Sequence, residues 1–159
     1  MHEYNGNKKL DINKLENMIN FFASKMKGLY KVKLMKLLWY ADSLHYKLHQ
    51  RSMTGLVYYH YDMGALPKGH HKILELKDVK VKEEFDSPEV IKYHILPREN
   101  FDESVFSKEE LEVLNSVVNR FRYTKTADMI AYMHDEVAYQ RTAPKELIPF
   151  ELAKEIREF

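Results

Sequence analysis

The hydrophobic pattern predicts its longest helix over residues 33–50. Leucine and alanine recur there at intervals of three and four residues, and larger apolar side chains fill the adjacent positions. The first set is Leu34, Leu37, Leu38, Ala41, Leu44 and Leu48, and the second is Met35, Trp39, Tyr40 and Tyr46. A helix that is apolar on more than one stripe packs against neighbours on several sides. We therefore expect this helix to lie at the centre of the domain.

An aromatic strand is predicted directly after this helix. The polar turn at residues 51–55 ends the helix, and residues 56–61 are rich in the branched and aromatic side chains that strands favour. Alternation places Val57, Tyr59 and Tyr61 on one face and Leu56, Tyr58 and His60 on the other. One face should belong to the core. The other either presents its rings to a partner, as interface anchors do, or is covered by a neighbouring helix.

Other helices are predicted from residues suited to a helix start. Asp11 is expected to cap a helix that ends at residue 26, and Thr126 one that ends at residue 137. Ser107 and Glu110 are expected to form the capping box of a helix that ends at residue 121. Two short helices are expected to begin at prolines, from Pro67 to residue 76 and from Pro149 to residue 156. Apolar residues follow each start at helical spacing.

A β-hairpin is predicted between residues 79 and 96. Residues 79–82 alternate apolar and basic side chains, residues 86–88 suit a turn, and residues 90–96 alternate again. With the aromatic strand, this hairpin could form a small three-stranded sheet. The predicted fold is α+β and mostly helical, with about five or six helices around the central helix and a small antiparallel sheet.

Three of these segments carry a family signature. They read KLMKLLWYAD at residues 33–42, RSMTG at 51–55 and GALP at 64–67. The series resembles the Panacea domain of SocA-like antitoxins, whose pattern is K-L-x-K-L-L-[FWY]-[FY]-A-D, then R-[ST]-[IM]-T-G, then an aromatic strand and a Gly-x-[VL]-Pro corner. The chain has Met-Gly-Ala at residues 63–65, where the family usually has Tyr-Gly-Pro. The matched residues expected to have structural roles are Trp39, Asp42, Arg51, Thr54, Gly55, Gly64 and Pro67.

The resemblance implies a non-enzymatic antitoxin of a bacterial or prophage toxin–antitoxin pair. Such a protein neutralises a toxin encoded nearby by direct protein binding. We expect the aromatic strand and the corner after it to supply the contacts, with Tyr59, Tyr61, Asp62 and Leu66 as the candidates.

The resemblance also bears on domain organisation. Some family members carry an upstream DNA-binding module, and residues 4–7, Tyr-Asn-Gly-Asn, resemble the linker that enters the domain. We expect residues 1–10 to be linker-like and residues 11–159 to be one Panacea-like domain. Two alternatives stay open: DNA contact through an absent upstream module, and association with a second copy of the chain.

Composition fits one globular domain. The 159 residues are 45% hydrophobic and 31% charged, and the net charge of +1 gives no reason to expect a polyanionic partner. The chain has no cysteine, which removes disulfides, thiolate nucleophiles and cysteine-built zinc sites. The polar start and the charged residues throughout favour a cytoplasmic protein without a membrane segment.

Charge is unevenly distributed along the chain. Basic residues cluster in the segment 25–51 and acidic residues dominate the segment 83–112. Mutual neutralisation or a solvated face is the ordinary use of such clusters. The alternative function is a DNA-binding regulatory module acting through the lysine-rich segment 25–51, whose binding would weaken steeply with salt.

No motif for catalysis accompanies these elements. The glycines form neither a G-x-G-x-x-G nor a Walker loop, and there is no G-x-S-x-G elbow. The histidines considered as metal ligands are His60, His70, His71, His94 and His134, and none has H-E-x-x-H spacing. A composite metal site, or a small hydrolase using His134 with Asp135 or Glu136, stays as a minor alternative. We expect no enzyme, no cofactor and no metal.

Asp42 is the one acidic residue within the apolar helix. A buried carboxylate needs partners to offset the cost of leaving water, and Arg51 or Lys36 could supply one. Ion-pair networks and active sites both contain such groups. We favour a structural anchor over a catalytic acid.

Overall fold

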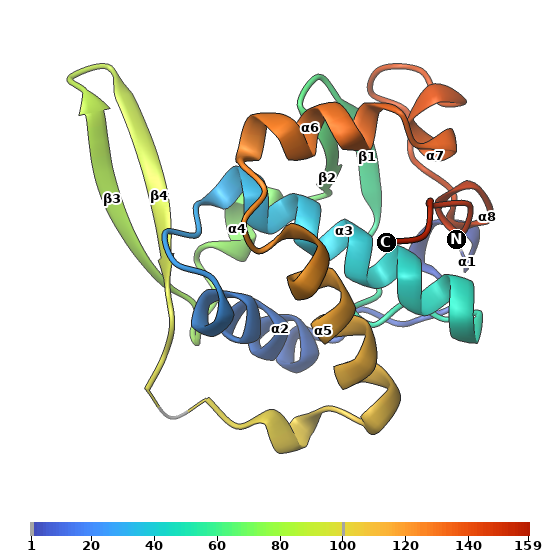
Figure 1. Cartoon of the computed structure of the whole chain (residues 1–159), viewed down its shortest axis with the longest axis horizontal. Coiled ribbons are helices and arrows are strands. Elements are labelled where there is room, and N and C mark those ends of the chain that lie inside the picture. Colours follow the sequence, from blue (N-terminus) through green and yellow to red (C-terminus); the bar gives the residue numbers. More distant parts are fainter. Residues whose placement is uncertain (1, 100) are drawn as a thin grey trace.

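The computed structural model describes residues 2–99 and 101–159 and places one helix at the centre of the molecule (Figure 1). This helix, α3 (Lys31–His49), is buried at every position from 34 to 43, as its apolar pattern predicts. The helices packed against it are α2 (Ile12–Lys25), α5 (Lys108–Phe121), α6 (Thr126–His134) and α8 (Phe150–Ala153). Leu48 differs from its predicted core position, because it lies in the last turn of α3 and is 55% exposed. The fold is α+β and mostly helical.

Short helical segments complete this part of the fold. They are α1 (His2–Asn5), α4 (His70–Ile73), the 3₁₀ turn η1 (Glu103–Val105) and α7 (Val137–Gln140). Within the described ranges, no helix combines the length and the apolar character that crossing a bilayer requires.

Two helix starts follow the predicted capping chemistry. Asp11 accepts a hydrogen bond from the backbone N–H of Lys14 at 3.0 Å. At the start of α5, Ser107 and Glu110 form both bonds of the capping box. These side chains satisfy backbone donors that a first helical turn leaves without partners.

Three other predicted helices differ in their ends. Thr126 does not cap α6, because Lys125 occupies that position without a side-chain bond and the helix ends at His134. The short helix predicted from Pro67 to residue 76 is present only as α4 (His70–Ile73), because Pro67 is the last residue of strand β2 (Gly64–Pro67). Pro149 precedes α8 as predicted, but α8 ends at Ala153. Local sequence therefore predicted where helices occur better than where they begin and end.

The aromatic strand is β1 (Tyr58–Tyr61), and it forms an antiparallel hairpin with β2. The predicted three-stranded sheet is wrong, because β3 (Lys80–Ser87) and β4 (Val90–Leu96) form a separate two-stranded sheet. The outer edge of β1 is paired by residues 145–148 instead. His60 donates its backbone N–H to Glu146 O at 2.8 Å, and Ile148 N–H donates to Tyr58 O at 2.9 Å.

The predicted β3–β4 hairpin is present and projects from the helical body (Figure 1). Its base is held where Ile95 N–H donates to Leu29 O at 2.8 Å and where Tyr30 stacks on His94. Nearer its turn, Phe85 pairs with Ile91 across the strands, and these side chains are 64% and 43% exposed. The outer part of the hairpin therefore presents apolar side chains to solvent.

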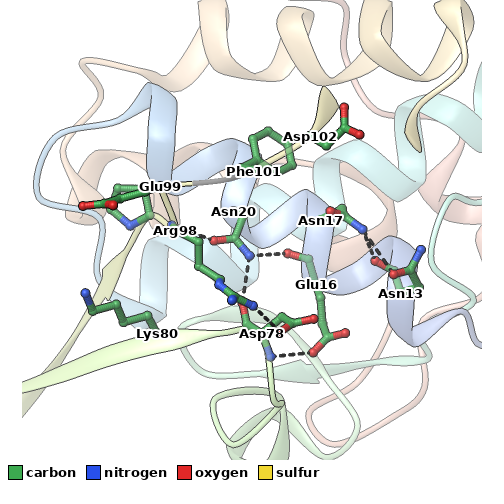
Figure 2. A pocket seen from close by; sticks show the side chains of 11 residues that line it. Asn13, Glu16, Asn17, Asn20, Asp78, Lys80, Arg98, Glu99, Phe101 and Asp102 are labelled. Carbon is green, nitrogen blue, oxygen red and sulfur yellow. Dashed lines mark hydrogen bonds and ion pairs between the residues drawn. The ribbon is translucent and has the colours of Figure 1, made fainter. Parts of the chain in front are cut away.

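A polar groove lies between α2 and the base of this hairpin (Figure 2). Asn20 donates to Asp78 O at 2.8 Å and accepts from the Arg98 backbone N–H at 3.1 Å. Asp78 N–H donates to Glu16 at 2.8 Å, and the Arg98 guanidinium pairs with the Asp78 carboxylate. Because these groups satisfy one another, the groove attaches both ends of the hairpin to α2.

Candidate functional site

Asp42 organises the turn that leads from α3 to β1. Its carboxylate is fully buried and accepts four hydrogen bonds, from the backbone N–H groups of Met53 and Thr54 at 2.8 and 2.9 Å, from the Thr54 hydroxyl and from the Tyr58 hydroxyl at 2.7 Å. Burial raises the pKa of Asp42, and the four donated bonds oppose that rise. The suggested pairing with Arg51 or Lys36 is wrong, because the donors to this carboxylate within residues 2–99 and 101–159 are neutral groups.

The turn residues have the structural roles that the motif suggests. Ser52 donates its hydroxyl to Asn5 O at 2.8 Å and accepts from the Gly55 N–H at 3.2 Å. Gly55 has φ +80°, and a Cβ there would lie 2.6 Å from Lys8 O. Arg51 is exposed, and its carbonyl faces the ring of His45. The turn therefore holds residues 5–10 against the domain through backbone approach and short hydroxyls.

Two further motif residues belong to the core. Trp39 is 1% exposed and meets the ring of Tyr40 edge to face at 5.0 Å. Pro67 is buried and lies opposite Tyr58 in the β1–β2 ladder. Pro67 thus supports the hairpin from the side that faces the protein interior, and Trp39 is part of the hydrophobic core.

The four residues predicted to bind a partner lie on the β1–β2 hairpin. Tyr59 is directly opposite Leu66 in the ladder, and its ring centroid is 5.8 Å from that of Tyr61. Tyr59 and Leu66 are partly buried, Tyr61 is 36% exposed, and Asp62 is exposed in the turn. Next to them, Met63 is 51% exposed. The opposite face, with Tyr58 and His60, is buried, so one face of β1 is core and the other reaches the surface.

Lys36 differs from the solvated face that the basic segment 25–51 suggests. Its side chain is 1% exposed. Its Nζ donates to Ala65 O at 3.1 Å, beneath the β1–β2 turn. Burial lowers the pKa of Lys36 to about 8. The signal was available, since every residue from 34 to 43 belongs to a helix that is apolar on several sides.

Gly64 makes this approach of Lys36 to the hairpin sterically possible. Its φ is +107°, and a Cβ there would lie 2.6 Å from Met133 Sδ and 2.9 Å from Lys36 Cε. The next residue, Ala65, donates its N–H to Met133 Sδ at 3.2 Å. Proline, which the family usually has at this position, has no N–H to donate. The departure at residues 63–65 therefore coincides with a sulfur contact from α6.

A small cleft of about 150 Å³ opens from Lys36 to the surface between α3 and the β1–β2 hairpin. Its apolar walls are Val32, Met35, Tyr61, Met63 and Leu66. Its polar members are Lys36, Lys31 and His70. Two of the predicted contact residues, Tyr61 and Leu66, thus line the same cleft as the buried ammonium group.

The other histidines are dispersed and engaged locally. His60 Nδ1 is 2.8 Å from the Thr142 hydroxyl, and its ring stacks on Tyr139. His94 pairs with Glu84 at 2.8 Å. Across residues 2–99 and 101–159, no group of three or more histidine, aspartate or glutamate side chains is placed to hold a metal ion.

The residues considered for a hydrolase have separate contacts. The two ring nitrogens of His134 lie 2.6 and 3.0 Å from the carbonyl oxygens of Ile130 and Asp62. Glu136 is buried and pairs with Arg157 at 2.8 Å. Asp135 is exposed. The structure therefore gives His134 and Glu136 local partners that fix helix ends and the C-terminal segment.

The lysine-rich segment 25–51 is not one continuous basic surface. Lys33 donates to Thr124 O at 2.7 Å, and Lys47 donates to Ile156 O at 2.9 Å. Lys25 pairs with Glu103 at 3.3 Å, and Lys36 is buried. Each of these side chains therefore has at least one hydrogen bond or ion pair within the protein.

Comparison with known proteins gives one match. A family model described as antitoxin SocA-like, Panacea domain, matches residues 34–139. The matched range contains α3 from Leu34 onward, both hairpins and the cleft residues from Met35 to His70. Neither the curated proteins nor the solved structures contain a match to this chain.

Proposed function

The chain belongs to the family of SocA-like antitoxins that carry a Panacea domain, and on that premise we propose that it neutralises a protein toxin by binding it directly. The toxin is a protein encoded nearby, in a bacterial or prophage pair. The proposed domain spans residues 11–159 and acts without catalysis, in the cytoplasm.

The observation that carries the proposed binding surface is the exposed rim of the β1–β2 hairpin. Tyr61 and Met63 stand at this rim beside the partly buried Tyr59 and Leu66. Large aromatic side chains on a rigid support dominate interface energetics, because they bury much area at low entropic cost. The opposite face of β1 is fixed in the core by Tyr58. The rim can therefore meet a partner without rearrangement of the fold.

Alanine variants of the rim test this proposal against a matched tyrosine elsewhere. Tyr61→Ala and Tyr59→Ala remove rim rings, whereas Tyr123→Ala removes a ring that is 90% exposed between α5 and α6. Thermal melts come first, to establish that each variant is folded. Co-expression rescue and calorimetric titration with the protein encoded beside this chain then measure neutralisation and affinity.

We expect Tyr61→Ala to weaken toxin binding by about 2 kcal/mol, or roughly 30-fold, and Tyr123→Ala to bind as wild type. Folded rim variants that rescue growth and bind as tightly as wild type would remove the rim from the proposal. Phe85→Ser, on the projecting hairpin, would then be the next variant to titrate. No binding by the wild-type chain would refute direct neutralisation itself.

A further inference from the structure

The ammonium group of Lys36 has unused hydrogen-bonding capacity in an enclosed place. A lysine side chain carries three N–H donors. Within the described residues, Ala65 O is the acceptor bonded to it, at 3.1 Å. A buried ammonium group with so few partners is costly. An anion in the adjoining cleft would supply the acceptors that the protein leaves out.

A second basic side chain, that of His70, lines the same cleft. His70 Nδ1 is buried and has no hydrogen-bond partner among the described residues. A neutral imidazole carries one ring N–H, and an acceptor placed against Nδ1 would select the tautomer that has the proton there. Lys31 adds a third basic group at the mouth of the cleft. These groups come from two separate segments, the first two turns of α3 and the start of α4.

The lining of the cleft has no counter-charge of its own. Its charged side chains are Lys31 and Lys36, and no aspartate or glutamate is among its lining residues in the described chain. The remaining walls are apolar, including Met35 and Leu66. The cleft therefore complements a small anion joined to an aliphatic stem. The polar groove of Figure 2 differs, because Glu16, Asp78 and Arg98 there already satisfy one another.

We propose that this cleft receives the carboxylate of an aspartate or glutamate side chain from the toxin, in contact with Lys36 and His70. This proposal rests on the proposed function and names the chemistry of the partner. A carboxylate offers two oxygens for the two inner donors, and the small volume fits one acidic side chain. Tyr61 and Met63 at the rim contact the apolar residues that flank the acid.

Binding of a carboxylate should change the protonation of Lys36 in a measurable way. Burial holds its pKa at about 8 in the free protein. An opposite charge within hydrogen-bond distance favours the charged form of a lysine. The pKa of Lys36 therefore rises when the cleft is filled, and the change is reported by the NMR signal of its ε-methylene group.

The first experiment uses a small probe and needs no toxin. The protein with ¹³C-labelled lysines is titrated with butyrate, a carboxylate on a short aliphatic chain, and separately with butanamide, its neutral analogue. We expect a saturable shift of the Lys36 signal with butyrate, none with butanamide, and loss of the signal in Lys36→Met. Absence of a saturable shift with butyrate would overturn the site.

The second experiment asks whether the toxin supplies the carboxylate. Lys36→Met keeps the aliphatic volume of the side chain, and Lys77→Met removes an exposed lysine as the matched control. We expect folded Lys36→Met to bind the toxin roughly 30-fold or more weakly, because a desolvated charge pair is lost, and Lys77→Met to bind as wild type. Unchanged affinity of Lys36→Met would overturn the inference. If Tyr61→Ala loses affinity and Lys36→Met does not, the proposed toxin binding stands and the carboxylate site is refuted.

Discussion

The hydroxyl of Tyr58 donates a hydrogen bond to the carboxylate of Asp42 at 2.7 Å, and both side chains are fully buried. This bond joins β1 to the middle of α3 across sixteen positions of sequence. The other donors to Asp42 come from Met53 and Thr54, so one carboxylate fixes the turn and the strand together. The orientation of the β1–β2 hairpin on the helical body follows from this contact.

Removal of the Asp42 carboxylate should destabilise the protein far more than removal of one donor. Asp42→Ala leaves four buried donors without an acceptor, and we expect a loss of at least about 3 kcal/mol. Tyr58→Phe removes one of the four bonds and should cost about 1–2 kcal/mol. Urea unfolding of both variants measures the difference. Equal losses would mean that the carboxylate is not the common anchor.

A charge in the middle of α3 should prevent folding. Leu37→Asp or Leu38→Asp places a carboxylate at a position that is 0% exposed, where it cannot be solvated. Leu48→Asp is the matched control, because that leucine lies in the same helix and is 55% exposed. Circular dichroism with thermal melting should show a cooperative transition for Leu48→Asp alone. A cooperative melt of Leu38→Asp near the wild-type temperature would contradict the position of α3 in the core.

A methyl group at residue 64 should disturb the packing of the hairpin on α3. In Gly64→Ala the new Cβ would lie 2.6 Å from Met133 Sδ, so side chains must shift. Gly69 has φ +72°, and no atom lies within 4 Å of a Cβ added there. Gly69→Ala therefore measures only the cost of placing a non-glycine residue at positive φ. We expect about 1 kcal/mol for Gly69→Ala and roughly 2 kcal/mol more for Gly64→Ala. Similar stabilities of the two variants by urea unfolding would show that the close approach is relieved without cost.

The stability of the protein should rise with pH above 8 because of Lys36. Its pKa is about 8 in the folded protein and 10.5 as the ordinary value. Between these values the unfolded chain holds a proton that the folded protein has lost, so deprotonation favours folding. The full effect is roughly 3 kcal/mol.

The matched variant for this pH dependence is Lys36→Met. The stability of this variant should not rise between pH 8 and 10. At pH 7 the variant should be more stable than wild type, because it has no buried charge at this position. Burial raises the pKa of Tyr58, and the resulting change in stability above pH 10 is the same in both proteins. It therefore cancels when their free energies of unfolding are subtracted. If the free energies of unfolding of wild type and Lys36→Met change with pH in parallel across this window, the buried ammonium group is contradicted.

The parts of the fold that local chemistry specifies could be predicted from the sequence. The Asp11 cap, the capping box at Ser107 and the apolar character of α3 each depend on residues close together in the chain. The residues 64–67 did not show a strand pattern, because their pairing with β1 depends on a tight turn and on support from α3 and α6. Pro67 suited a helix start equally well, and the ladder decided otherwise.

The candidate site was also predicted only in part, because some of its features follow from local sequence and others depend on contacts between distant segments. Aromatic alternation predicted that Tyr59 and Tyr61 share one face of β1, and in the structure Tyr61 is exposed on that face and Tyr59 is partly buried. The partners of Asp42 were missed because charge attraction suggested Arg51, whereas backbone and hydroxyl donors close in space satisfy the carboxylate. Lys36 was suggested only as a partner of Asp42, whereas its ammonium group donates to Ala65 O in the hairpin. Its burial depends on Gly64, which allows the hairpin to approach the helix.

The pairing of β1 with residues 145–148 has a consequence for the newly made chain. A strand edge with unpaired N–H and C=O groups is a template for another strand. The segment that covers this edge, through Glu146 and Ile148, is synthesised long after β1 has left the ribosome. Contacts between such distant parts of a sequence also form slowly. During synthesis, therefore, the hairpin passes through an interval in which its outer edge is open to other chains, and chaperone protection matters most in that interval.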